Sequence, residues 1–251
     1  MLSVVVPCYD NRALALASMA TLDAFLARRA PDAEVILVDD GSRSAERLRR
    51  DELPARVTLV QLPENRGKGH AVRAGMARAR GDCRLFTDVD LPYELEAIPH
   101  ARDLVAGGFH AVFGDRTLRA SAAEVPLPLV RRAASRAFTK LVSVLVVSGV
   151  PDTQCGFKVF SGALADALFP LLTIDRFAFD VELYYVLLKH DVLIRRIPVR
   201  LRNAGPSSVL PATDGAEMAR ALLRLPWNHR RGRYRSAALE ALGPGPYWPE
   251  G

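Results

Sequence analysis

Apolar and polar residues alternate in blocks along the first half of the chain. Short apolar runs bounded by turn residues are typical of buried strands, and stretches with helical spacing or helix-forming composition lie between them. The predicted strands are residues 2–6, 34–38, 57–62, 83–87 and 111–114. The predicted helices are residues 13–29, 43–51, 65–80 and 95–106. This alternation predicts an α/β fold with a mostly parallel, doubly wound sheet and helices on both faces.

The second half of the chain has a different pattern, with longer polar stretches between its apolar segments. The predicted elements are an amphipathic helix at 130–147, an aromatic-rich helix at 177–188, a strand at 194–201 and a helix at 214–225. The tail from Asn228 onward is basic and then rich in Gly and Pro. We therefore expect this tail to be loosely ordered.

Composition narrows the class of protein and of partner. The chain has 251 residues, 49% hydrophobic and 25% charged, which suits one α/β domain, alone or with an appendage. The net charge of +6 and the pI of about 9.5 favour anionic partners such as nucleotides, phosphates and acidic membranes. Nucleic acid fits poorly, because the sequence has no aromatic-basic interleaving, helix-turn-helix pattern or zinc-finger spacing.

The cysteines and the N-terminus indicate a cellular compartment. Cys8, Cys83 and Cys155 have no C-x-x-C spacing, which argues against a disulfide framework and a structural zinc site. A reducing cytoplasm fits best. The N-terminus begins directly in a strand-like run without a basic segment, so we expect no secretory signal. No apolar run reaches the ~20 residues of a membrane span.

Four polar clusters follow predicted strands, at residues 7–10, 39–42, 65–69 and 88–90. Ligands of doubly wound sheets lie in the crevice outside the carboxyl ends of the strands. Four clusters that meet at one edge are much more specific than any one of them. The pattern therefore predicts a binding site at this edge.

Asp88 and Asp90 are the most informative residues of these clusters. Two carboxylates two residues apart, at the mouth of a buried strand, can share Mg²⁺ or Mn²⁺, and such an ion can hold a diphosphate. A lone Asp-x-Asp is common by chance, and a turn after a strand also favours Asp. The position of the pair beside the other clusters favours the metal site.

Two neighbouring clusters have two interpretations each. One carboxylate of Asp39 and Asp40 can accept from a nucleotide base or a ribose hydroxyl, or both can serve the turn and cap the next helix. Gly41 supplies a tight backbone in either case. Lys68 lies between two glycines before a helix, where the backbone can approach an anion. The alternative is an ordinary glycine-rich turn.

Charged residues further along the chain are also ambiguous. Arg116 can bind a phosphate or pair with a carboxylate. Arg131 belongs to a basic set at helical spacing, which faces either membrane headgroups or bulk solvent. Asp180 and Glu182 are two residues apart and cannot share a helical face. We expect one of them to point into a site and the other to be solvated.

These segments resemble, in chain order, the motifs of family 2 glycosyltransferases of the GT-A fold. More narrowly, they resemble the polyprenyl (dolichyl)-phosphate glucosyl- and mannosyltransferases, over residues 2–210. The most specific segments are Asp-Thr-Gln-Cys-Gly-Phe-Lys at 152–158 and Phe-Asp-Val-Glu-Leu at 179–183. The chain departs from the family at Asp10-Asn11, where Asn-Glu is usual. It also lacks the transmembrane helices that many polyprenyl members carry.

The resemblance implies a metal-dependent, inverting hexosyltransferase that moves a hexose from a UDP- or GDP-sugar to a polyprenyl-phosphate-type acceptor. It implies that Asp88 and Asp90 hold Mg²⁺ or Mn²⁺ against the diphosphate. The residues assigned to donor binding are Pro7, Tyr9, Asp39, Asp40, Gly41 and Lys68. The residues assigned to the acceptor phosphate are Arg116, Arg131 and Arg202. The residues assigned to catalysis are Asp88, Asp90, Arg116 and Asp180.

The nature of the acceptor decides whether a base is needed. A phosphate monoester has its second pKa near about 6, so it is largely dianionic at neutral pH and needs positioning by arginines more than deprotonation. A hydroxyl acceptor would need a carboxylate base, for which Asp180 or Glu182 would be the candidate.

The expected organisation is a GT-A catalytic domain at 1–210 and a C-terminal helix with a basic, Gly/Pro-rich tail at 211–251. Residues 1–115 form the nucleotide-sugar half of the domain and residues 116–210 the acceptor half. We expect a cytoplasmic protein with peripheral contact to the cytoplasmic membrane surface. Two alternatives stay open: a glycosyltransferase for a soluble acceptor such as a natural product, glycan or peptide hydroxyl, and a non-catalytic nucleotide-sugar binding protein.

Overall fold

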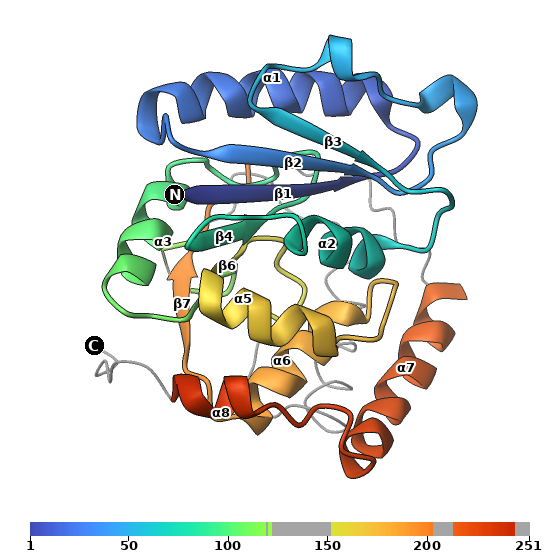
Figure 1. The fold of residues 1–251 in the computed structure, drawn as a ribbon, viewed down its shortest axis with the longest axis vertical. Helices are drawn as coiled ribbons and strands as arrows, with labels where there is room; N and C mark the ends of the chain where they lie inside the picture. Colours follow the sequence, from blue (N-terminus) through green and yellow to red (C-terminus); the bar gives the residue numbers. More distant parts are fainter. Residues whose placement is uncertain (119, 122–151, 203–212, 244–251) are drawn as a thin grey trace.

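The computed structural model describes residues 1–118, 120–121, 152–202 and 213–243, with the backbone alone for 213–219 (Figure 1). The predicted helix at 130–147, and Arg131 with it, lies outside the described residues. Within the described ranges, no helix has the length and apolarity needed to cross a bilayer.

A seven-stranded sheet forms the centre of the molecule, in the order β3-β2-β1-β4-β6-β5-β7. The strands are β1 (Leu2–Cys8), β2 (Glu34–Asp39), β3 (Val57–Gln61), β4 (Cys83–Phe86), β5 (Ala111–Asp115), β6 (Lys158–Ser161) and β7 (Ile194–Pro198). Strands β3, β2, β1 and β4 pair in parallel, β6 is antiparallel to both β4 and β5, and β5 pairs in parallel with β7. The predicted mostly parallel sheet is confirmed.

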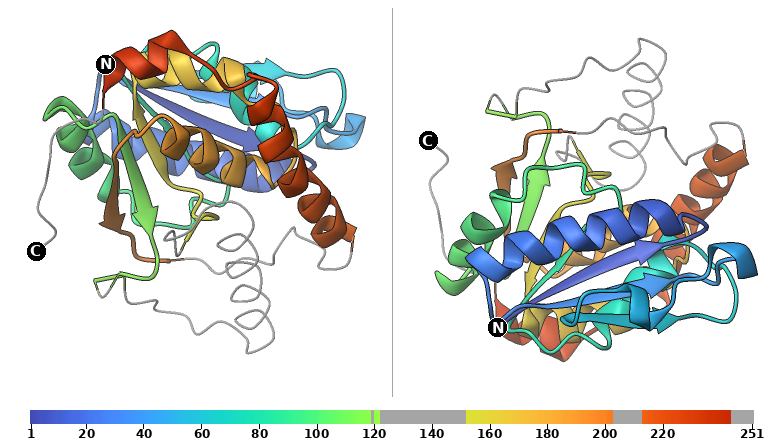
Figure 2. Two further views of the ribbon diagram at one scale, coloured as in Figure 1. Left: turned by 90° about the horizontal axis from the view of Figure 1, so that it is seen from below. Right: turned by 90° about the horizontal axis from the view of Figure 1, so that it is seen from above.

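Helices cover both faces of the sheet (Figure 2). They are α1 (Arg12–Arg29), α2 (Lys68–Met76), α3 (Ala97–Ala106), α5 (Gly162–Leu168), α6 (Phe179–Lys189), α7 (Thr213–Arg230) and α8 (Ala237–Leu242). Side chains alternate across a strand, so Val5 of β1 joins the core under α2 and α6, while Val4 and Val6 join the core under α1 and α3. Every residue of β1 is buried, as expected for a central strand covered on both faces.

The structure corrects two local predictions about helices. The helix at 43–51 is wrong: this stretch contains only two 3₁₀ turns, Ser44–Glu46 and Arg50–Glu52. Its glutamates are used by tertiary contacts, since Glu46 accepts from the backbone of Arg12 and Glu52 pairs with the Arg12 side chain. The helix predicted at 65–80 covers only Lys68–Met76. It begins late because Gly67 has a left-handed φ of 116° and the chain before it forms a loop.

The expectation of a loosely ordered tail from Asn228 is also wrong as far as residue 243. Helix α7 continues to Arg230, and α8 follows it and packs on α5. Tyr234, between the two helices, is only 1% exposed and belongs to the core under α6. Apolar burial therefore attaches this segment to the sheet in spite of its basic composition.

Candidate active site at the carboxyl edge of the sheet

The predicted polar clusters meet at one edge of the sheet. Strands β1, β2 and β4 are parallel neighbours, with Cys8 opposite Asp39 and Val5 opposite Phe86. Asp88 follows β4 by two residues, and the backbone N–H of Thr87 donates to the carbonyl of Val5. The segments after these three strands therefore lie side by side, as the sequence predicted.

Lys68 provides the positive charge at this edge. Its Nζ lies 2.6 Å from Oδ1 of Asp88 and 3.9 Å from Oδ2 of Asp180. The side chain lies against the rings of Phe86 and Phe179 and is 14% exposed. Burial opposes the charge, but the two carboxylates outweigh burial and raise the pKa of Lys68 above its usual value. Lys68 therefore stays charged throughout the physiological pH range.

Lys158 forms a second, fully buried ion pair beneath the first. Its Nζ donates to Oδ1 of Asp180 at 2.6 Å and to the carbonyls of Cys155 at 2.7 Å and Thr153 at 3.1 Å. All three ammonium protons have partners, so the buried charge is compensated. Asp180 thus lies between two lysines, and the turn 153–155 is fixed below the site. The sequence motif contained Lys158, but nothing in its pattern indicated this role.

Asp90 has an uncompensated oxygen suited to a cation. Its Oδ1 is buried and has no hydrogen-bond partner. Burial first, and then the negative charge of Asp88, raise the pKa of Asp90 above its usual value. A hard divalent cation binds such carboxylate oxygens and would remove the repulsion. No cluster of three or more acidic, His or Cys ligands exists among the described residues. Diphosphate oxygens and water could complete the coordination of an ion held by the two aspartates, an arrangement typical of Mg²⁺.

Gly156 leaves the space that the Asp88 carboxylate occupies. A Cβ added at Gly156 would lie 1.9 Å from Oδ2 of Asp88. We expect Gly156→Ala to displace this carboxylate and to lower the rate of the hexosyl transfer expected from the sequence by about ten- to a hundredfold, as small displacements in active sites do. Steady-state rates of the purified variant measure the effect. Gly107→Ala is the matched control, because its Cβ would meet no atom closer than 3.3 Å. Equal rates for both variants would contradict the role given to Gly156.

The two aspartates after β2 hold the surrounding loops. Oδ1 of Asp39 accepts from the backbone of Ser42 at 2.9 Å. Oδ2 of Asp40 accepts from the backbone of Gly67 at 2.6 Å. Gly41 has a φ of 70°, and a Cβ there would collide with the backbone at Glu64. Both aspartates thus accept hydrogen bonds from loop backbones, which was one of the two interpretations of the sequence. Contacts of Asp39 and Asp40 with a nucleotide remain predictions.

Pro7 and Tyr9 lie at the end of β1, as expected for residues that line a pocket beyond the strand. Pro7 is buried within the strand, whereas Tyr9 is 44% exposed. Asp10 follows with a left-handed φ of 48°, and its carboxylate pairs with Arg43. The aromatic ring of Tyr9 is thus available to a ligand at the edge, and its predicted contact with the nucleoside remains a prediction.

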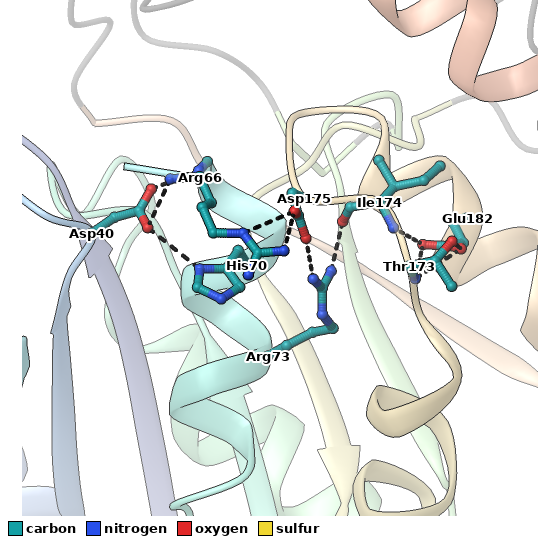
Figure 3. Close-up of polar contacts among 9 residues, drawn as sticks. Asp40, Arg66, His70, Arg73, Thr173, Ile174, Asp175 and Glu182 are labelled. Carbon is teal, nitrogen blue, oxygen red and sulfur yellow. Dashed lines mark hydrogen bonds and ion pairs between the residues drawn. The ribbon is translucent and has the colours of Figure 1, made fainter. Parts of the chain in front are cut away.

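A loop before α6 clamps the segment that carries Lys68. Figure 3 shows the Asp175 carboxylate between the side chains of Arg66 and Arg73. The backbone N–H of His70 donates to the Asp175 carbonyl at 3.0 Å. Burial would raise the pKa of Asp175, but the hydrogen bonds from Arg73 and Arg66 lower it below its usual value. No sequence motif pointed to Asp175, because its partners lie about a hundred residues earlier in the chain.

We expect Asp175→Asn to lower kcat/KM for the nucleotide-sugar donor expected from the sequence by about tenfold, since loss of the two ion pairs frees the segment that positions Lys68. The fold should persist because the Asp175 backbone contact is unchanged. Donor KM and kcat, measured separately, check the result. Asp51→Asn breaks an exposed pair with Arg49 away from this loop and should leave both constants unchanged. A kcat/KM for Asp175→Asn equal to that of Asp51→Asn would refute the positioning role.

Neither Asp180 nor Glu182 is solvated, contrary to the expectation that one of the two would be, and Glu182 has the larger set of partners. It is fully buried and accepts from the backbones of Thr173 and Ile174, from the Thr173 hydroxyl and from the hydroxyl of Tyr234 at 2.7 Å. Both of its oxygens are used by these contacts, which hold the loop with Asp175 against the C-terminal segment. Helix α6 therefore buries both acidic residues, with Asp180 toward the lysines and Glu182 toward Tyr234.

The predicted acceptor arginines have different surroundings. Arg116 forms a two-pronged pair with Asp152, with Nε and Nη2 at 2.8 and 2.7 Å from the carboxylate. This is the carboxylate pairing considered from the sequence, and phosphate binding by Arg116 stays a prediction. The backbone N–H of Arg202 donates to the carbonyl of Pro92, so this exposed residue lies beside the segment that follows Asp90. Arg131 lies outside the described residues.

This fold and its charged edge define a GT-A-type glycosyltransferase. The chain belongs to the family described as glycosyl transferase family 2, whose family model matches residues 3–169. It is 32% identical to dolichyl-phosphate beta-glucosyltransferase of Dictyostelium discoideum over 249 residues, covering 93% of this chain and 76% of that protein. The human protein of the same description is 30% identical, with 93% and 77% covered.

Solved structures of two other proteins have a fold similar to that of this chain. Glucosyl-3-phosphoglycerate synthase from Mycobacterium tuberculosis, in complex with uridine diphosphate, superposes with a TM-score of 0.64 at 19% identity, covering 92% of this chain and 80% of that chain. Mannosyl-3-phosphoglycerate synthase from Rubrobacter xylanophilus has a TM-score of 0.63 at 16% identity, with 93% and 75% covered. At these identities the likeness concerns the fold alone.

Proposed function

We propose that this protein is an inverting hexosyltransferase that moves a hexose, with glucose favoured, from a UDP- or GDP-sugar to a polyprenyl phosphate. The observation that carries the proposal is the pair Asp88 and Asp90 with Lys68 at the carboxyl edge of the sheet. The likeness to dolichyl-phosphate beta-glucosyltransferases supports both the sugar and the lipid-phosphate acceptor. We place the reaction in the cytoplasm, at the membrane surface.

The donor's diphosphate would lie at Asp88, Asp90 and Lys68. The two aspartates would hold a Mg²⁺ or Mn²⁺ ion, which would supply charge compensation for a diphosphate leaving group. Lys68, kept charged by Asp88 and Asp180, adds a fixed positive charge beside the same group. Asp180 and Lys158 hold Lys68 and the floor of the site in place.

A phosphate acceptor suits the state of the acidic residues on α6. Asp180 is paired with Lys158 and lies near Lys68, so its negative charge is already balanced. Glu182 is enclosed by the loop at 173–174 and by Tyr234. Neither carboxylate is free to deprotonate a hydroxyl, and a dianionic phosphate requires no such base. The need for positioning falls on arginines, for which Arg116, Arg131 and Arg202 are our candidates.

A donor panel tests the proposal. UDP- and GDP-sugars are incubated with Mg²⁺ or Mn²⁺ and a short polyprenyl phosphate, and both donor hydrolysis and transfer are scored. We expect metal-dependent transfer from one nucleotide class. Transfer only to a soluble hydroxyl acceptor would support the soluble-acceptor alternative, and binding of a nucleotide sugar without any turnover would support the non-catalytic one.

A further inference from the structure

The outward side of α7 exposes large apolar side chains. Leu223 is 67% exposed and Trp227 is 55% exposed. They are four residues apart and therefore lie one above the other on the same helical face. Leu222 and Leu225 are buried in the core and attach the opposite face to the protein. The exposure of Leu223 and Trp227 is therefore not needed for packing within the described residues.

Arginines surround these two apolar side chains. We call the following set the α7 outer face: Arg220, Leu223, Arg224, Trp227, Arg230 and Arg231. All four arginines are exposed. The spacing of Arg220, Arg224 and Arg230, three or seven residues from Leu223 or Trp227, places them on the same side of the helix. The guanidinium of Arg231 lies over the Trp227 ring at 4.5 Å. Among the side chains that the structure describes, no carboxylate forms an ion pair with any of the four arginines.

We propose that the α7 outer face binds the surface of an anionic phospholipid bilayer. Exposed Leu and Trp enter the boundary between headgroups and acyl chains, where Trp is enriched. Arginine stems extend along the apolar layer while their charged ends reach anionic headgroups. An apolar centre ringed by exposed arginines that pair with no carboxylate among the described side chains matches this partner in both respects.

A second copy of this chain fits the surface less well. A symmetric dimer through the α7 outer face would place the same patch on both subunits, so arginines would oppose arginines. An anionic bilayer compensates the same charges. Charge complementarity thus favours the lipid surface over self-association.

The position of α7 would bring a bound bilayer to the same side of the molecule as the candidate active site. In Figure 1, α7 stands on the right, the side on which β1, β2 and β3 end. A bilayer bound to α7 would lie on the same side of the molecule as the carboxyl edge of the sheet. The benefit to a lipid-linked acceptor rests on the proposed function, whereas the bilayer binding itself does not.

Vesicle binding tests the proposal without donor or acceptor. The chain has two tryptophans, so Trp248→Phe leaves Trp227 as the only one. We expect this protein to float with vesicles that contain phosphatidylglycerol and not with pure phosphatidylcholine, with a blue shift of Trp227 emission and quenching by brominated lipid. Binding should weaken in high salt, because the arginine contribution is electrostatic.

Variants locate the surface. The double variant Leu223→Ser/Trp227→Ser should lower the vesicle partition coefficient by at least about tenfold, and Arg220→Gln/Arg224→Gln by about fivefold for each arginine. Leu193→Ser removes a 39% exposed leucine outside α7 and is the apolar control. Arg28→Gln/Arg29→Gln removes two exposed charges on α1 and is the charge control. Both controls should bind like the wild type.

Three results would overturn the proposal. The first is no binding of the wild type to phosphatidylglycerol vesicles. The second is equal loss in the α7 and control variants, which would indicate a general charge effect. The third is self-association that depends on Leu223 and Trp227 without vesicle binding, which would assign the face to a second copy. Thermal melts confirm that the variants fold, and transfer to a detergent-solubilised acceptor reports the proposed function separately.

Discussion

Asp90→Asn should lose nearly all metal-dependent transfer, by about a thousandfold, because a neutral amide holds a divalent cation much more weakly than a carboxylate. The same change should leave the protein at least as stable as the wild type. Burial and the charge of Asp88 raise the pKa of Asp90, so its ionised form is disfavoured in the folded state. Rates measured over a range of Mg²⁺ and Mn²⁺ concentrations, with a thermal melt of the metal-free protein, check both parts.

A raised melting temperature together with a lost rate would exclude unfolding as the cause of the loss. Asp103→Asn is the matched control, because Asp103 is exposed on α3, away from the carboxyl edge. An Asp90→Asn protein with wild-type rates at low metal concentration would remove the metal assignment altogether.

Lys158→Met should destabilise the protein most strongly. It removes the partner of Asp180 in a fully buried pair, and breaking one side of such a pair typically costs about 3–5 kcal/mol. We also expect transfer to fall, because the unpaired Asp180 carboxylate would draw Lys68 away from Asp88, which is 2.6 Å from Lys68 in the intact site. Urea unfolding and steady-state kinetics measure the two effects.

A double variant separates charge from packing. Lys158→Met/Asp180→Asn removes both charges and should recover part of the lost stability, because no buried carboxylate is left without a partner. Lys189→Met changes an exposed lysine on the same helix as Asp180 and should leave the unfolding curve unchanged. If Lys158→Met unfolds like Lys189→Met, the buried pair has no structural importance.

Local patterns predicted the first half of the fold well. The strands before residue 115 are apolar runs, and their carboxyl ends carry the polar clusters that meet in the structure. Strand β6 could not be found in this way, because its four residues begin with Lys158, which is polar yet fully buried. Its burial depends on Asp180, which lies 22 residues later and on another element. A local sequence pattern does not indicate such a distant partner.

The residues of the candidate site were likewise predictable only where they follow a local pattern. Asp88, Asp90 and Lys68 were predictable as a group because they follow neighbouring strands. The supporting residues were not, since Gly156 matters through the space beside Asp88 and Asp175 through two arginines from another loop. The buried environment of Glu182 depends on Tyr234, in a tail whose basic composition suggested disorder.

Linkage analysis of the product tests the central claim most directly. The protein is incubated with UDP-glucose or GDP-glucose, a divalent metal and a short polyprenyl phosphate, and the lipid product is examined by ³¹P and ¹H NMR. We predict a phosphate diester with the anomeric configuration inverted relative to the donor, and no product from the corresponding polyprenol without phosphate. A product with retained configuration, or a sugar attached to the polyprenol in place of its phosphate, would contradict the account.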